Sequence, residues 1–238
     1  MKTVWITGGG TGIGKALALK LVKQGHKVYI SGRNIEKLEA VGTGTIPVVC
    51  DITNQDSVQA AVAKIGPVDL ALLNAGTYAP GPTHETPIDQ IRQAMEVNYF
   101  GTVHCLQAVL PVMKENGGHL AVVASLAGYR GLPNASGYGP SKAALISLCE
   151  SIKAELSDSA VKFQVINPGF VKSPLTDKNS FAMPYLMEAD DAADAILKGL
   201  EKKAFEIAFP LRFVLQMKFL KWLPDRFYFP LMRKVMQK

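Results

Sequence analysis

Residues 3–18 read TVWITGGGTGIGKALA, in which a short apolar run is followed by a glycine-rich turn and then by a helix-forming segment. Gly8, Gly12 and Gly14 let the chain turn tightly, let the backbone approach a pyrophosphate, and let the helix pack on the strand. The helix start presents free N–H groups and the positive end of its dipole to such a phosphate. A glycine-rich turn directly after a first strand therefore predicts a dinucleotide site.

The rest of the chain repeats this alternation of strand and helix. Seven short apolar runs predict strands at residues 3–7, 27–31, 46–50, 70–74, 119–125, 163–167 and 206–209. Their continuous apolar character is typical of parallel strands that are covered on both faces. Helical periodicity lies between them, at residues 12–24, 55–64, 88–115, 139–157 and 189–203. The pattern predicts an α/β fold with a Rossmann-like, doubly wound, seven-stranded parallel sheet.

Length and charge divide the chain into a domain and a tail. We expect one catalytic domain over residues 1–210, because 238 residues suffice for a single core, and a helical tail over residues 211–238. The net charge is +6, and the tail alone carries seven basic residues against Asp225, which leaves the domain with no net charge. A basic nucleic-acid face spread over the fold is therefore not expected, and any electrostatic partner should meet the tail.

Cysteine and histidine usage indicates the setting. The three cysteines are odd in number and far apart, and neither they nor the four histidines show a metal-ligand spacing. We expect no metal and a reduced, cytoplasmic setting. The first residues read as a strand and not as a signal peptide.

Further motifs follow the predicted strands in order. They are Asn74-Ala75-Gly76, Asn98, Ser125, Tyr138-x-x-x-Lys142 and Pro168-Gly169. Together with the Thr-Gly-x-x-x-Gly-Ile-Gly turn, this order and spacing resembles the short-chain dehydrogenase/reductase family over residues 1–210. The resemblance implies an NADP(H)-dependent oxidoreductase that moves a hydride between nicotinamide and a carbonyl or alcohol, and a homo-oligomer, either dimer or tetramer.

The predicted catalytic residues are Asn98, Ser125, Tyr138 and Lys142. Tyr138 and Lys142 lie four positions apart in a helical segment and so share one face. A nearby ammonium stabilises a phenolate, so we expect Lys142 to lower the pKa of Tyr138, which then serves as general acid in reduction and general base in oxidation. Ser125 would donate a hydrogen bond to the substrate oxygen. Asn98 is explained by a helix kink that orders a water for proton relay to Lys142, and the resemblance implies that Lys142 also holds the nicotinamide ribose.

Arg33 indicates the cofactor. An NAD-selective site offers an acidic side chain after the second strand, whereas this chain has Ser31-Gly32-Arg33-Asn34 there. A guanidinium suits a 2′-phosphate, so we expect NADPH to be preferred over NADH. By resemblance, Asn74 supports the adenosine ribose region, Asp51-Ile52 flanks the adenine, and Ser173 with Val171 contacts the carboxamide. The full predicted cofactor set is Gly8, Thr11, Gly12, Ile13, Gly14, Arg33, Asp51, Ile52, Asn74, Ala75, Gly76, Tyr138, Lys142, Pro168, Gly169, Val171 and Ser173.

The predicted substrate space is apolar. We expect it to be lined by Tyr78, Leu126, Leu132 and Phe170, and residues 174–188 resemble the family's mobile lid. Apolar walls favour a small ketone, aldehyde or β-ketoacyl compound over a sugar.

Two other functions are weighed against this one. A catalytically inactive nucleotide-binding sensor or scaffold protein would share the glycine turn, but the four intact catalytic residues argue against it. A sugar-nucleotide epimerase or dehydratase shares the Tyr-x-x-x-Lys pair, but it needs a larger C-terminal domain than this chain supplies.

The tail at residues 211–238 leaves two interpretations open. Six aromatic residues stand among its basic residues, which suits a helix pair lying on anionic lipid as a peripheral membrane contact. The alternative is a pair of helices packed over the pocket or forming a subunit contact. Its charge, with Pro224 and Pro230, excludes a transmembrane helix.

Overall fold

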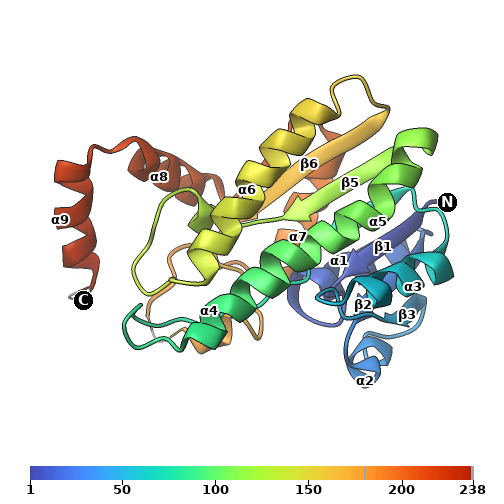
Figure 1. Ribbon diagram of the computed structural model, residues 1–238, viewed down its shortest axis with the longest axis horizontal. Helices are drawn as coiled ribbons and strands as arrows, with labels where there is room; N and C mark the ends of the chain where they lie inside the picture. Colours follow the sequence, from blue (N-terminus) through green and yellow to red (C-terminus); the bar gives the residue numbers. More distant parts are fainter. Residues whose placement is uncertain (180, 237–238) are drawn as a thin grey trace.

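Seven parallel strands form one sheet in the computed structural model, which describes residues 1–179 and 181–236 (Figure 1). Their order is β3-β2-β1-β4-β5-β6-β7, which confirms the predicted fold class. The bounds are β1 Thr3–Thr7, β2 Lys27–Gly32, β3 Thr45–Val49, β4 Leu70–Leu73, β5 Gly118–Val123, β6 Val161–Pro168 and β7 Glu206–Phe209. Because β1 pairs with β2 on one side and with β4 on the other, a crevice opens beyond the carboxyl ends of these strands.

Helices cover both faces of the sheet. One face carries α1 (Gly12–Lys23), α2 (Ile35–Glu39) and α7 (Ala189–Glu201). The other carries α3 (Gln55–Ile65), α5 (Gly101–Asn116) and α6 (Tyr138–Glu155). Each layer has its own apolar core, with Leu17 and Ile196 fully buried in the first and Val58 and Cys149 in the second. This double covering is the reason why the strands are apolar along their whole length.

The segment predicted as one helix over residues 88–115 is three successive elements. These are α4 (Ile88–Met95), a π-helical turn (Glu96–Phe100) and α5. A π turn widens the helix locally, and here it contains Asn98, whose side chain is completely buried. A π-helical turn therefore stands where a kink was expected.

The helix α2 was not predicted from the sequence. This helix has five residues and one buried side chain, Leu38, which is too short for periodicity to reveal. Its start is fixed by Asn34, whose Oδ1 accepts a hydrogen bond of 2.9 Å from the backbone N–H of Lys37. The short helix holds residues 34–38 at the carboxyl end of β2.

The tail forms two helices, α8 (Leu211–Trp222) and α9 (Asp225–Met236), which lie at the opposite end of the molecule from α2 and β3 (Figure 1). Arg130 fastens them to the domain: its guanidinium donates to the carbonyl oxygen of Leu220 at 2.6 Å, pairs with Asp225 at 2.6 Å, and lies 3.7 Å from the ring centre of Tyr228. No helix within the described residues is both long and apolar enough to cross a bilayer.

Candidate active site

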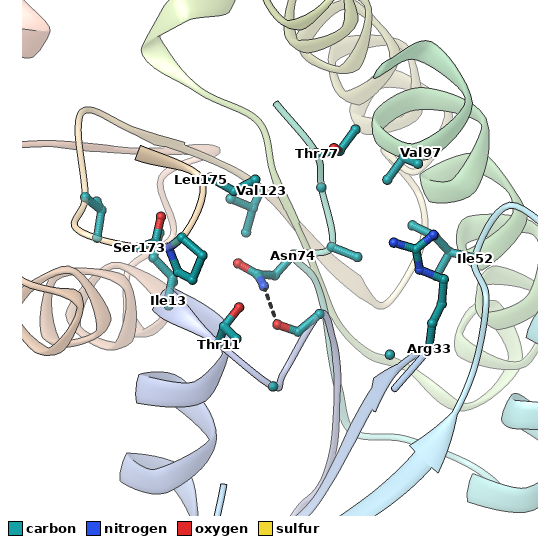
Figure 2. A pocket seen from close by; sticks show the side chains of 18 of the residues that line it. Thr11, Ile13, Arg33, Ile52, Asn74, Thr77, Val97, Val123, Ser173 and Leu175 are labelled. Carbon is teal, nitrogen blue, oxygen red and sulfur yellow. Dashed lines mark hydrogen bonds between the residues drawn. The ribbon is translucent and has the colours of Figure 1, made fainter. Parts of the chain in front are cut away.

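A cavity of about 570 Å³ lies at the carboxyl ends of the strands. Figure 2 shows Arg33 and Ile52 at one end of it and Ser173 and Leu175 at the other, with Asn74 between them. The two ends are supplied by different halves of the sheet, since Arg33 follows β2 and Ser173 follows β6. The shape is that of an elongated groove across the switch point.

The glycine turn closes one side of this cavity. Gly8 has a φ of +65°, and a Cβ there would lie 2.8 Å from the Cα of Ala75. At Gly14 a Cβ would lie 2.4 Å from the carbonyl oxygen of Gly8. The Nδ2 of Asn74 donates to the carbonyl oxygens of Thr7 at 3.1 Å and Gly8 at 3.2 Å, and so ties the end of β4 to the turn. Side chains are therefore excluded where β1, the turn and α1 meet.

The start of α1 offers hydrogen-bond donors to the cavity. Gly12 and Ile13 line it, and among the described residues no acceptor meets their backbone N–H groups. Thr11 is the N-cap residue, and its side chain makes no capping hydrogen bond. Unsatisfied N–H groups at a helix start, in a glycine cradle, fit a pyrophosphate, so the residues present match the predicted dinucleotide.

The Arg33 end of the cavity is basic. Arg33 and Lys37 both line it, and no carboxylate forms a salt bridge with Arg33 in the described part of the chain. The guanidinium extends beside Ile52 in Figure 2. Lys15, in the first turn of α1, is not among the lining residues.

Three predicted catalytic residues meet in the same cavity. Ser125 follows β5, and its Oγ accepts a hydrogen bond of 3.1 Å from the backbone N–H of Ala127. Tyr138 is the first residue of α6, and Lys142 follows one turn later. Lys142 is 3% exposed, and its Nζ donates to the carbonyl oxygen of Val123 at 2.8 Å, 5.7 Å from the ring centre of Tyr138.

The pKa directions differ from the expectation. Burial raises the pKa of Tyr138, the Ser125 hydroxyl opposes this rise, and Tyr78 adds to it. Burial also lowers the pKa of Lys142 to about 8. The prediction that Lys142 lowers the pKa of Tyr138 is therefore wrong for this structure, because desolvation acts against both charged forms and the ammonium is bonded to a backbone carbonyl.

Asn98 lies behind the cavity and does not line it. Its Oδ1 accepts a hydrogen bond of 2.7 Å from the backbone N–H of Thr77, and its Nδ2 donates to the carbonyl oxygen of Thr77 at 3.1 Å and to Ser141 Oγ at 2.9 Å. Gly76 separates it from Lys142: a Cβ at Gly76 would lie 3.2 Å from Asn98 Oδ1 and 3.7 Å from Lys142 Nζ. In this structure Asn98 braces the strand end against α6.

Most of the predicted cofactor residues share this one cavity. The exception is Gly14, which packs behind the turn. The residues that do line it are Gly8, Thr11, Gly12, Ile13, Arg33, Asp51, Ile52, Asn74, Ala75, Gly76, Tyr138, Lys142, Pro168, Gly169, Val171 and Ser173.

The expected substrate residues are placed differently. Leu126 is 1% exposed and packs beneath α8 against Val214 and Met217, so the prediction that it lines the substrate space is wrong. Leu132 joins the same cluster, and the ring of Phe170 stacks on Phe213 with centroids 5.5 Å apart. These apolar side chains pack against the tail helix α8. A contact between segments so far apart along the chain leaves no pattern in the sequence.

Tyr78 does face open space. It lines a hollow of about 330 Å³ whose lining shares Thr77, Gln93 and Lys178 with the main cavity. The Nζ of Lys178 donates to the carbonyl oxygen of Tyr78 at 2.8 Å, and so joins the lid to this loop.

Several lining residues escaped the sequence analysis, among them Lys37, Thr53 and Thr176. Thr176 donates to the carbonyl oxygen of Val171 at 2.9 Å and accepts from the N–H of Ser173 at 2.9 Å, which shapes the chain after β6. One sequence feature could have located Lys37: Asn34, three residues earlier, is a typical N-cap residue and predicts the start of a helix that contains Lys37. Thr53 lies in a turn and Thr176 begins a three-residue 3₁₀ helix, and neither has a distinguishing sequence pattern.

Comparison with known proteins agrees with this geometry. The family model described as short chain dehydrogenase matches residues 2–183. An uncharacterized oxidoreductase of Myxococcus xanthus is 36% identical over 236 residues, covering 94% of this chain and 93% of its own. An uncharacterized oxidoreductase of Staphylococcus epidermidis is 32% identical over 208 residues, covering 84% of this chain and 90% of its own.

A solved structure shows the same likeness. The crystal structure of a short chain dehydrogenase from Burkholderia cenocepacia in complex with NADP superposes with a TM-score of 0.86 at 31% identity, covering 94% of each chain. The family match spans the glycine turn, Ser125, Tyr138 and Lys142. The chain belongs to the short-chain dehydrogenase/reductase family, and it is an NAD(P)-dependent oxidoreductase.

Proposed function

We propose that this protein is an NADPH-preferring reductase of small apolar carbonyl compounds, with Tyr138 as its acid/base. One observation carries the proposal: Ser125, Tyr138 and Lys142 line the same cavity as the glycine turn and Arg33. A proton donor, a hydrogen-bond donor and an amine thus share a groove of dinucleotide shape. The opposite reaction, oxidation of the alcohol, uses the same groups in reverse.

The side chains of this chain handle the proton and the developing charge. Bound NADPH supplies the hydride. The Tyr138 hydroxyl donates its proton to the substrate oxygen, and Ser125 donates a hydrogen bond to the same oxygen as negative charge develops there. Because burial raises the pKa of Tyr138, the phenol is protonated at neutral pH, which is the form that can act as the acid in reduction.

The preference for NADPH is supported by the basic end of the groove. Arg33 and Lys37 both line it, which suits a 2′-phosphate, and the related Burkholderia cenocepacia protein was solved in complex with NADP. Ser173 lies at the far end of the groove (Figure 2), and Val171 also lines it. We assign both to the carboxamide and Lys142 to the ribose hydroxyls.

The proposed apolar substrate is supported by Tyr78. Its side chain lines the adjoining hollow, and its ring lies against the ring of Tyr138 with centroids 5.0 Å apart. An aromatic ring beside the reacting groups offers few hydrogen bonds to a polyhydroxylated compound, so ketones, aldehydes and β-ketoacyl thioesters are the substrates to test.

The test is a screen of NADPH oxidation against those three classes, repeated with Tyr138→Phe. We expect the substitution to lower kcat/KM by roughly 10²–10⁴-fold while NADPH still binds. Tyr99→Phe is the matched control, because Tyr99 lies outside the cavity and its hydroxyl forms no hydrogen bond with the described residues. Undiminished turnover in Tyr138→Phe would contradict the assignment. NADPH binding without turnover of any carbonyl compound would favour a nucleotide sensor.

A further inference from the structure

The outer face of α8 is a continuous apolar stripe exposed to solvent. Leu211, Leu215, Phe219 and Trp222 follow a spacing of four, four and three residues, which places them on one side of the helix. They are 70%, 59%, 65% and 82% exposed. The inner face, with Val214 and Met217, is buried on the domain. This helix therefore presents large side chains outward, where a surface helix ordinarily presents polar ones.

Exposed basic side chains lie on both tail helices. Arg212, Lys218 and Lys221 are exposed on α8, and Arg226, Arg233 and Lys234 are exposed on α9. Lys218 is paired with Glu206 of the domain, and the one acidic residue of the tail, Asp225, is paired with Arg130. The remaining basic residues leave the two tail helices strongly positive.

Exposed apolar side chains next to basic ones are typical of helices that lie on anionic lipid. We propose that the outer face of α8 binds the surface of an anionic lipid bilayer. Large apolar side chains enter the boundary between headgroups and acyl chains, while lysine and arginine meet the phosphates. A second copy of this chain is a poorer partner, because a two-fold contact through the same face would bring basic residues against basic residues.

The predicted lid segment contacts α8 and also carries exposed apolar side chains. Tyr185 lies beside Phe213, with ring centroids 6.1 Å apart, and its hydroxyl accepts a hydrogen bond of 3.0 Å from Gln216 Nε2. Phe181 and Leu186 on the same segment are 48% and 44% exposed. Binding through α8 thus brings the lid to the lipid surface. If the proposed reductase activity is also correct, the groove would take its apolar substrates directly from the bilayer.

The domain holds α8 so that the outer face keeps its orientation. Lys218 Nζ bonds to Glu206 Oε2 at 2.7 Å, and Arg130 bonds to the carbonyl oxygen at Leu220. Glu206 is itself fixed by the Nδ2 of Asn167, at 2.7 Å, next to the cavity residue Pro168. The outer face of α8 is therefore ordered before it contacts lipid. Binding then costs little conformational entropy.

Tryptophan fluorescence of the full chain tests the proposal directly. The two tryptophans differ sharply, since Trp5 is fully buried and Trp222 is 82% exposed. With vesicles of phosphatidylcholine and phosphatidylglycerol in equal parts, we expect the emission to shift to the blue, and to shift much less with phosphatidylcholine alone or in high salt. Trp222→Phe should abolish the shift while the protein still sediments with the anionic vesicles.

Vesicle co-sedimentation separates the contribution of the apolar side chains to lipid binding from that of the basic ones. Leu215→Ser with Phe219→Ser should lower the partition coefficient by about tenfold or more, from the loss of apolar burial. Lys221→Glu should lower it by about fivefold or more. Val49→Ser is the matched control, because Val49 is 55% exposed in β3, at the other end of the molecule, and should change nothing.

Three outcomes would overturn the proposal. The first is equal sedimentation with anionic and neutral vesicles, and the second is equal sedimentation of Leu215→Ser/Phe219→Ser and the unchanged chain. The third is a dimer in lipid-free solution that the same double substitution disperses, which would assign the face to a second copy. Far-ultraviolet circular dichroism and NADPH binding of each variant verify the fold, so loss of lipid binding is distinguished from misfolding and from failure of the proposed reductase activity.

Discussion

The ring of Tyr138 lies edge to face against the ring of Tyr78, with centroids 5.0 Å apart and an interplanar angle of 80°. The hydroxyl of Tyr78 in turn donates to Asn179 Oδ1 at 2.8 Å. One side chain therefore touches both the proposed acid/base and the segment that follows β6. We therefore expect Tyr78 to act as a positioning residue between the reaction centre and the predicted lid.

Tyr78→Phe should separate these two contacts. The ring against Tyr138 is kept and only the hydrogen bond to Asn179 is lost, which is worth on the order of 1 kcal/mol. We expect KM for the carbonyl substrate to rise about two- to tenfold with kcat little changed. Steady-state kinetics of Tyr78→Phe and Tyr78→Ala would check this, and a Phe variant as impaired in kcat as the Ala variant would contradict it.

Arg33→Ala should change cofactor selectivity. If the guanidinium binds the 2′-phosphate, its loss weakens NADPH by about 1.5–3 kcal/mol, or roughly ten- to a hundredfold in Kd, and leaves NADH nearly unaffected. Titration calorimetry with both cofactors measures the ratio. Lys15→Ala is the control, since Lys15 does not line the cavity. An equal loss for NADPH and NADH would show that Arg33 does not read the phosphate.

Lys142→Met should stabilise the fold near neutral pH while it abolishes turnover. The pKa of Lys142 falls from 10.5 to about 8 on burial. Between these values the unfolded chain binds more protons than the folded one, so stability rises with pH through this window and the buried charge is a cost below it. We expect the free energy of unfolding at pH 7 to rise by on the order of 1–3 kcal/mol. The loss of the hydrogen bond from Lys142 to the carbonyl oxygen of Val123 reduces this gain.

Urea unfolding at pH 7 and near pH 10 measures this effect, and the difference between Lys142→Met and the unchanged chain should shrink as the pH rises. Lys153→Met is the matched control, because Lys153 is exposed on the same helix. A stability difference that stayed constant with pH would mean that burial does not shift the pKa of Lys142.

Gly14→Ala should damage both stability and cofactor binding. The new Cβ would lie 2.4 Å from the carbonyl oxygen of Gly8 and 2.7 Å from Asn74 Nδ2, so the turn must move. We expect a loss of roughly 1–3 kcal/mol in unfolding free energy and weaker NADPH binding. At Gly131 a Cβ would meet nothing within 4 Å, so Gly131→Ala should leave both quantities unchanged. Thermal unfolding with and without NADPH compares the two.

The cofactor groove was the part of the site most accessible to sequence reasoning. Short-range rules connect Gly8 and Gly12 to a tight turn, and strand ends to one edge of a parallel sheet. These rules depend on the backbone, so Arg33, Ser125 and Tyr138 were expected together and are found together. The substrate side was not accessible in the same way, because Leu126 and Phe170 are taken by contacts with α8 that are distant along the chain.

The alternation of strands and helices along the chain, the glycine turn and the meeting of Ser125, Tyr138 and Lys142 could be predicted from the sequence alone, since periodicity and turn chemistry are local properties of the chain. Only the tertiary structure decided which apolar side chains face the groove, which lie under the tail helix and which remain on its outer surface. It also decided that burial, and not the charge of Lys142, governs the pKa of Tyr138. The physical reason is that exposure and desolvation depend on everything packed around a residue, which its place in the sequence does not record.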